Sequence, residues 1–343
     1  MKTKLFLSTV ICLFLSNTAI ANDADLCSSK PLKEAIPYCE KACNQGDAST
    51  CGFLGFLYAL DDDYQQTKIY YEKACNLNDG YACANLGGLY AEGHGVTQNN
   101  QQAKIYYEKA CNLNNSLGCK ELGLFYSESQ NFQKAKIYYE KACNLNDGYG
   151  CTILGILYAS GQGLIQDYQQ AKIYYEKACN LNNGWGCEEL GGLYSTGRGV
   201  SQNYQQAKIY REKACNLHIS SGCSYLGWLY SEGKGVRQNY QQAKIYYEKG
   251  CSQNDGYGCF GLGNLYFLGN GVRQNYQLGV RYFEQSCNLK ESKGCLALGI
   301  SYNTYGIGVT TDAKKAKEYY GKACDLGEQL GCDEYRKLNE QGY

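Results

Sequence analysis

Cysteine is the residue type in this sequence with the most scope for chemistry. The chain has 343 residues, among them 21 Cys, 35 Tyr and 41 Gly but only 2 His. Cysteines at this density form disulfides or hold metal ions. Two histidines leave almost no capacity for a histidine-based metal or acid–base site. The chemistry of the chain therefore depends first on how its cysteines are used.

Most cysteines recur in pairs with seven residues between the two members. A disulfide within each pair is the favoured interpretation, and closing so short a loop contributes about 2.5 kcal/mol. A zinc site is less favoured because Cys-x7-Cys is not zinc-knuckle spacing, and a redox-catalytic site because Cys-x-x-Cys is absent. The nine pairs are Cys43/Cys51, Cys75/Cys83, Cys111/Cys119, Cys143/Cys151, Cys179/Cys187, Cys215/Cys223, Cys251/Cys259, Cys287/Cys295 and Cys324/Cys332.

The N-terminal segment predicts export. Residues 1–21 combine Lys2 and Lys4 with a short apolar run and the small-x-small site Ala19-Ile20-Ala21, as in a secretory signal peptide. The apolar run is shorter than the roughly 20 residues of a membrane span. We therefore expect a periplasmic or secreted protein without a membrane span. Cleavage would remove Cys12 and leave 20 cysteines, of which Cys27 and Cys39 would form a tenth disulfide at the start of the chain.

Each cysteine pair belongs to a repeat that predicts two helices. In the third repeat, a helix over about 100–114 places apolar residues at i, i+3, i+4, i+7 and i+8, and a second helix follows over about 117–127. Asn-Asp-Gly or a similar triplet forms the turn, and Gly-x-Gly-Val ends the second helix. A Tyr five residues before each first Cys, from Tyr38 to Tyr319, is expected in the core.

A helix pair of this kind cannot bury its apolar face alone, so neighbouring repeats must stack. The predicted fold is an all-α, right-handed solenoid of about nine disulfide-stapled helix-turn-helix units in a single domain over 22–343. The units span approximately 28–60, 61–96, 97–128, 129–164, 165–200, 201–236, 237–272, 273–309 and 310–343. A recurring mid-helix glycine suggests close helix approach, and its copies are Gly55, Gly87, Gly123, Gly155, Gly191, Gly227, Gly263 and Gly299.

The overall charge excludes some classes of partner. Lys plus Arg and Asp plus Glu both number 33, so the formal net charge is zero. Such a chain has no electrostatic footprint for nucleic acid or an anionic membrane surface. We expect a monomer without cofactor or metal.

The repeat skeleton is similar to a known family. The pattern A-x-x-Y-Y-x-K-A-(A/C), then (A/C)-x-x-L-G-x-x-Y-x-x-G-x-G-V, resembles Sel1-like repeats, relatives of tetratricopeptide repeats, over about residues 30–340. Cysteines at the two Ala positions, with an export signal, resemble the Helicobacter and Campylobacter secreted cysteine-rich proteins. That resemblance implies weak β-lactamase or penicillin-binding activity, with a β-lactam or cell-wall fragment as ligand.

The residues themselves show no constellation for that activity. The sequence has one Ser-x-x-Lys, Ser231 to Lys234, in an ordinary connector, and it lacks Ser-Asp-Asn and Lys-Thr-Gly elements. His94 and His218 fall in different phases of the repeat, so they do not predict a zinc site. No catalytic residue is assigned, and the enzyme question stays open at this stage.

The best functional signal is an apolar row on the first helices. Six isoleucines share a phase opposite the core of the helix, and they become Pro37, Arg281 and Glu318 in the outer repeats. One interpretation is a concave-face groove for a protein or peptide partner. The alternative is that tight curvature packs each Ile against the neighbouring helix. The six candidates are Ile69, Ile105, Ile137, Ile173, Ile209 and Ile245.

Overall fold

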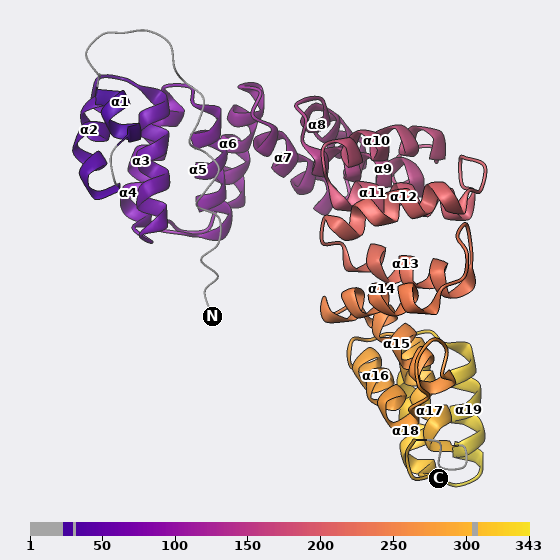
Figure 1. The fold of residues 1–343 in the computed structure, drawn as a ribbon. Coiled ribbons are helices and arrows are strands. Elements are labelled where there is room, and N and C mark those ends of the chain that lie inside the picture. The colour runs from indigo at the N-terminus through magenta and orange to yellow at the C-terminus, as the bar shows by residue number, and fades with distance from the viewer. Residues whose placement is uncertain (1–22, 30–31, 304–307) are drawn as a thin grey trace. The chain divides into compact units, whose positions relative to one another are not determined.

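The computed structural model describes residues 23–29, 32–303 and 308–343. The predicted signal segment 1–21, with Cys12, lies outside the described residues. Within those ranges the chain forms nineteen α-helices and no strand. The all-helical, repeated helix-turn-helix architecture predicted from the sequence is confirmed, and Figure 1 shows the helices succeeding one another from indigo to yellow.

The described chain divides into two compact units, one up to Gly118 and one from Cys119. The first unit contains α1 (Asp23–Ser29), α2 (Leu32–Asn44), α3 (Ala48–Leu60), α4 (Tyr64–Asn76), α5 (Gly80–Glu92) and α6 (Asn100–Asn112). The division falls within α7 (Ser116–Glu128).

The second unit continues with α8 (Phe132–Asn144), α9 (Gly148–Ser160), α10 (Tyr168–Asn180), α11 (Gly184–Thr196), α12 (Tyr204–Asn216) and α13 (Ser220–Glu232). It ends with α14 (Tyr240–Ser252), α15 (Gly256–Leu268), α16 (Tyr276–Asn288), α17 (Ser292–Asn303), α18 (Ala313–Asp325) and α19 (Gln329–Glu340). From α2 onward, even-numbered helices are the first helices of the predicted repeats and odd-numbered helices the second.

The turn between α10 and α11 is built by two adjacent polar residues. Asn182 takes a left-handed conformation with φ 58°, which asparagine tolerates better than most residues. Asn183 then caps α11, because its side chain accepts a hydrogen bond from the Gly186 amide at 3.1 Å.

The Gly-x-Gly connector that follows α5 returns the chain to the start of α4, the first helix of the same repeat. Gly93 and Gly95 have φ of 77° and 67°, in the left-handed region. A Cβ on Gly95 would lie 2.5 Å from the Cβ of Tyr64, so the backbone passes directly against α4. Gln65 Nε2 donates to the Gly95 carbonyl at 2.9 Å and ties the connector to the start of that helix.

The mid-helix glycine is where an aromatic ring of the next even-numbered helix enters the core. A Cβ on Gly155 would lie 2.5 Å from the ring of Tyr175, which is almost fully buried. The same contact joins Gly227 to Tyr247 and Gly263 to Phe283. The close approach suggested by the sequence is therefore between backbone and aromatic ring.

Successive odd-numbered helices approach each other more closely than successive even-numbered helices do. Within the second unit, α9 contacts α11, α13 contacts α15, and α15 contacts α17. The odd-numbered helices therefore form the more closely packed side of this unit.

Candidate functional site

Disulfides close the turn of each repeat. Every described cysteine is disulfide-bonded, so these residues offer neither a free thiolate nor a metal ligand. In nine of the disulfides, the two Cα atoms lie 4.5–4.8 Å apart. These disulfides are Cys27–Cys39, Cys43–Cys51, Cys75–Cys83, Cys143–Cys151, Cys179–Cys187, Cys215–Cys223, Cys251–Cys259, Cys287–Cys295 and Cys324–Cys332.

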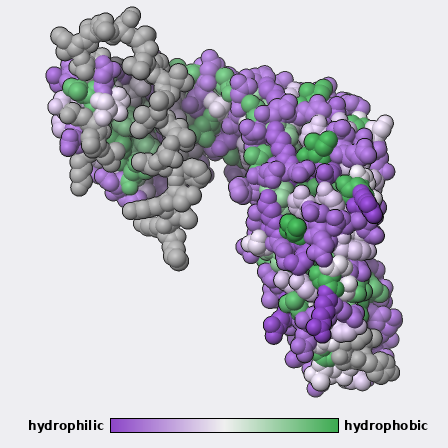
Figure 2. Space-filling model, in the orientation of Figure 1, coloured by the Kyte–Doolittle hydropathy of each residue, from purple (hydrophilic) through white to green (hydrophobic). Residues whose placement is uncertain are grey.

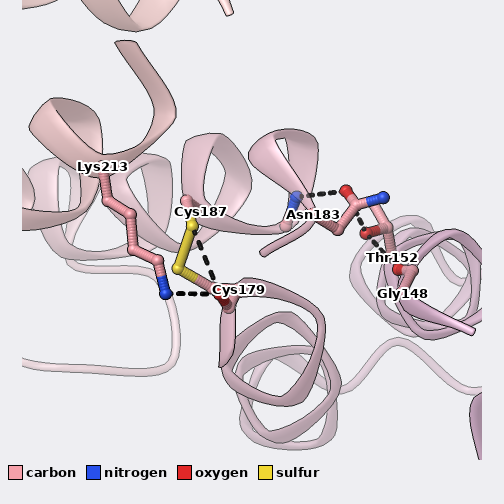
Figure 3. Close-up of a disulfide and its surroundings, with 7 residues drawn as sticks. Gly148, Thr152, Cys179, Asn183, Cys187 and Lys213 are labelled. Atoms are coloured by element: carbon pink, nitrogen blue, oxygen red, sulfur yellow. Dashed lines mark hydrogen bonds between the residues drawn. A yellow bond between two sulfur atoms is a disulfide. The ribbon is translucent and has the colours of Figure 1, made fainter. Parts of the chain in front are cut away.

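Polar contacts connect the disulfide-closed turns of neighbouring repeats (Figure 3). Lys213 Nζ donates to the carbonyl of Cys179 at 2.6 Å, at the C-terminal end of α10. Thr152 Oγ1 contacts the Asn183 side chain at 3.0 Å and donates to the Gly148 carbonyl at 2.9 Å. The disulfide therefore fixes a turn that also holds the adjacent repeats.

The Ser-x-x-Lys residues do not form a catalytic pair. Ser231 is buried, and its Oγ donates to the Trp228 carbonyl at 3.0 Å and lies 3.2 Å from the Tyr247 hydroxyl. Lys234 Nζ instead lies over the Trp228 ring, 4.5 Å from its centroid. Both side chains therefore have structural partners.

The histidines also lack metal-site partners. His94 Nδ1 pairs with Glu92 at 3.0 Å and its ring stacks on Tyr64, while His218 occupies a left-handed turn position. Among the described residues, no group of three His, Cys, Asp or Glu side chains is placed to hold a metal ion. No described helix is long and apolar enough to cross a bilayer. Figure 2 shows that hydrophilic residues cover much of the visible face of the described chain, with hydrophobic residues scattered among them.

The six candidate isoleucines point away from the core of their helices. Their side chains are 51–61% exposed, so packing against the neighbouring helix leaves about half of each one accessible. Ile69 and Ile105 belong to the first unit, and the other four to the second. In the second unit they lie on even-numbered helices, whereas the more closely packed side consists of odd-numbered helices.

The isoleucines of the second unit lie on helices with an excess of positive charge. Helices α8, α10, α12 and α14 carry four Glu, of which Glu176 and Glu248 pair with Lys172 and Lys244 at 3.0 and 2.6 Å. Arg211 on α12 is buried and paired with Glu188, and the other nine basic residues are Lys134, Lys136, Lys141, Lys172, Lys177, Lys208, Lys213, Lys244 and Lys249. A neutral chain therefore presents a locally basic, apolar surface.

The recurring tyrosines lie at the edge of the core, where they stack in pairs. Tyr174, for example, stacks on Tyr158 with ring centroids 5.6 Å apart and planes 10° apart. Burial raises the pKa of Tyr174, and the nearby Glu140 and Tyr158 raise it further. The sequence located these tyrosines but did not indicate their partners, which come from the preceding odd-numbered helix.

One repeat replaces its core tyrosine with a charged group. Arg211 lies against Gly191, and its guanidinium pairs with Glu188 and sits 4.3 Å from the Tyr225 ring centroid. Burial lowers the pKa of Arg211 to about 10. Glu188 Oε2 and Arg211 Nε have no hydrogen-bond partner in the described chain. The ion pair is thus incompletely satisfied.

Comparison with known proteins identifies the family. The Sel1 repeat model matches residues 32–47, 51–79, 80–115, 148–183, 186–218, 220–255, 256–290 and 292–328, which is well over half of the chain. A tetratricopeptide repeat model matches residues 121–149. The chain belongs to the Sel1 repeat family, whose repeats form protein-interaction folds.

Solved structures share the fold. A Sel1 repeat protein from Oxalobacter formigenes is 20% identical, with a TM-score of 0.68 over 97% of this chain and 100% of that one. A protective antigen of uropathogenic Escherichia coli is 23% identical, with a TM-score of 0.52 over 92% and 85%. Helicobacter pylori cysteine-rich protein B is 43% identical over 37% of this chain and 93% of its own, with a TM-score of 0.32.

One curated relative matches a short segment. Thirty residues are 60% identical to an uncharacterised protein of Haemophilus influenzae, and they make up 9% of this chain. The match spans 58% of that relative, less than two thirds of its length.

Proposed function

We propose that this protein is an exported scaffold that binds a protein or peptide partner through the exposed isoleucines of its even-numbered helices. The observation that carries the proposal is the repeated exposure of Ile137, Ile173, Ile209 and Ile245 at one position of the repeat. Apolar side chains that recur on one exposed face are typical of docking surfaces. Their basic surroundings favour a partner with acidic residues.

An oxidising compartment supports the export part of the proposal. Disulfides persist outside the cytosol, and every described cysteine of this chain is in one. Export through residues 1–21 remains a prediction, tested by N-terminal sequencing of the mature protein. A start at Asn22 is the expected result, and an intact Met1 in an exported fraction would contradict it.

The docking surface is tested by affinity capture with oxidised protein, followed by titration of the purified partner. Changing Ile173→Glu together with Ile209→Glu should abolish binding, because two carboxylates would replace apolar contacts. The melting curve should stay unchanged, since both side chains are exposed. Two exposed connector substitutions made together, Gln162→Glu and Ser201→Glu, add the same two charges and serve as the control. Equal affinity of the double variant and the control would refute this surface.

β-Lactam hydrolysis is not favoured by any observation in the structure. Ser231 and Lys234 are engaged separately, and the activity rests on family resemblance alone. A chromogenic cephalosporin assay with oxidised protein tests it directly. We expect no turnover above a denatured control.

A further inference from the structure

The odd-numbered helices of the second unit present a second, chemically different face. On each of them, the residues two and five positions after the second cysteine lie one helical turn apart on the same side. On α9 these are Ile153 and Ile156, on α11 Glu189 and Gly192, and on α13 Tyr225 and Trp228. We call Ile153, Ile156, Glu189, Tyr225 and Trp228 the odd-helix face, and all five are partly exposed.

This face varies from repeat to repeat, whereas the cysteines, the mid-helix glycine and the leucine before it recur. A position that performs the same structural task in every repeat keeps its residue type, as the mid-helix glycine does. A position that varies in every repeat is free to match one particular ligand. The residues two positions after the second cysteine are Phe53, Asn85, Glu121, Ile153, Glu189, Tyr225, Gly261 and Ala297.

The charge of these helices is opposite to that of the even-numbered helices. Helices α9, α11, α13 and α15 contain no Lys or Arg and three acidic residues, Glu188, Glu189 and Glu232. Arg211 neutralises Glu188. Glu189 has no ion-pair or hydrogen-bond partner in the described chain, and burial raises the pKa of its carboxyl group. A desolvated carboxylate without a cation is a ready partner for a basic side chain.

The aromatic residues of the face can supply the apolar part of an interface. Tyr225 and Trp228 lie side by side on α13 with ring centroids 5.0 Å apart. Their positions are held by Arg211 over the Tyr225 ring and Lys234 over the Trp228 ring. Gly192 takes the place of Trp228 on the preceding odd-numbered helix, and the nearest atom to a Cβ there would be Arg211 Nη2 at 3.5 Å. Tyr and Trp are the residues that most often dominate binding energy.

We propose that the odd-helix face docks a basic peptide segment that also carries apolar side chains. A Lys or Arg of the segment would pair with Glu189, and its apolar side chains would pack on Trp228, Tyr225 and the α9 isoleucines. This surface is separate from the one in the proposed function, Ile137, Ile173, Ile209 and Ile245 on the even-numbered helices, which we call the isoleucine row. The occupant is basic because the odd-numbered helices α9, α11, α13 and α15 supply carboxylates and no Lys or Arg. The two cations beside the face are already engaged, Arg211 by Glu188 and Lys234 by the Trp228 ring.

The test is a selection of displayed random peptides on the oxidised, full-length protein. The enriched peptides should contain Lys or Arg together with apolar residues. Binding of a selected peptide should weaken about tenfold in Trp228→Ala and about tenfold in Glu189→Gln, as expected for anchor residues. Glu189→Gln removes only a charge and tests the surface even if Trp228→Ala fails to fold.

Matched variants separate this face from the isoleucine row. Two off-face variants should leave binding unchanged: Ile165→Ala in the exposed connector after α9, and Glu318→Gln on the even-numbered helix α18. The Ile173→Glu, Ile209→Glu variant should also bind the selected peptide normally. If that variant alone loses binding, the odd-helix face is overturned and the isoleucine row stands.

Other results would also overturn the proposal. Enrichment of acidic or uncharged peptides, or no enrichment above background, would contradict a basic occupant. Sedimentation analysis tests whether a second copy of the chain occupies the face instead. Concentration-dependent association that Trp228→Ala removes would assign the face to self-association and refute the peptide proposal.

Discussion

Arg211 occupies the position where neighbouring repeats bury Tyr175 and Tyr247. A buried aromatic ring contributes apolar contact, whereas a buried ion pair must first overcome the desolvation of two charges. The Arg211–Glu188 pair leaves one polar atom of each side chain without a partner. We infer that this repeat carries a local loss of stability that the other repeats avoid.

Restoring the common residue should recover that stability. The double variant Glu188→Ala, Arg211→Tyr should raise the free energy of unfolding by about 1–4 kcal/mol, because it replaces a buried ion pair with apolar contact. Arg211→Ala alone should lower it by about 3–5 kcal/mol, because Glu188 would stay buried without a cation. Chemical denaturation measures both values.

An exposed pair provides the control for this comparison. Removing Lys208 and Glu212, which lie 3.9 Å apart on the surface of α12, should change the free energy of unfolding by less than about 1 kcal/mol. A double variant of Glu188 and Arg211 that is less stable than the natural protein would contradict the interpretation.

The buried tyrosines predict a loss of stability at alkaline pH. Burial raises the pKa of Tyr139 and Tyr247 to about 12. Unfolding exposes these phenols, whose pKa then falls to about 10. The unfolded chain therefore releases protons first, so the free energy of unfolding should be constant below pH 10 and decrease between pH 10 and 12.

Denaturant titrations at several pH values measure this effect, and absorbance at 295 nm reports phenolate formation. Tyr139→Phe should flatten the alkaline decrease because it removes one of the titrating groups. A free energy of unfolding that stays constant up to pH 12 would exclude the coupling.

At the scale of single helices, two adjacent glycines of α5 have opposite roles. A Cβ on Gly87 would lie 2.6 Å from the Tyr107 ring, whereas a Cβ on Gly88 would have its nearest neighbour 3.9 Å away. Gly87→Ala should therefore lower the free energy of unfolding by about 1–3 kcal/mol through overpacking. Gly88→Ala should raise it by about 0.5–1 kcal/mol, because alanine favours the helix.

Each glycine variant is the control for the other, since the two share a helix and a substitution. Thermal or chemical unfolding of both proteins decides the point. If both variants changed the free energy of unfolding in the same direction, contact with the Tyr107 ring would not be the reason for a glycine at position 87.

Helices and turns were largely predictable because each depends on residues close in sequence. The Asn-Asn turn before α11 and the Gly-x-Gly connectors are local signals, and they appear where expected. The partner of each tyrosine was not predictable from helical phase alone. Tyr158 and Tyr174 come from consecutive repeats, and their stacking depends on how those repeats pack.

At the scale of the whole molecule, the repeated disulfides should add up to a large share of the stability. Replacing Cys179 and Cys187 together by Ala should lower the free energy of unfolding by about 2.5 kcal/mol, from the chain entropy of the opened loop. Full reduction should lower the melting temperature far more than this single change. Calorimetry of native, variant and reduced protein measures the series.

Thiol labelling provides the matching chemical test. The protein should show no reactive thiol among its described cysteines before reduction, because all of them are disulfide-bonded. Several labelled cysteines in the native protein would contradict that state.

The candidate surfaces show where sequence analysis reached its limit. The isoleucine row was found because its residue type repeats at a fixed phase. The odd-helix face was missed because its residue types change between most repeats, so periodicity cannot detect them. Glu189 and Trp228 become candidates once the packing shows which side of the stack they share and which charges lack partners.

The short span of the disulfides also determines how the chain can be oxidised as it emerges into its compartment. Among the described cysteines, Cys27 and Cys39 come first in the chain and are partners, and the next two, Cys43 and Cys51, are partners as well. The other seven disulfides given above also join cysteines that are consecutive in the chain. A thiol oxidase acting in order of emergence therefore produces these native bonds directly, without an isomerase to correct mispaired ones.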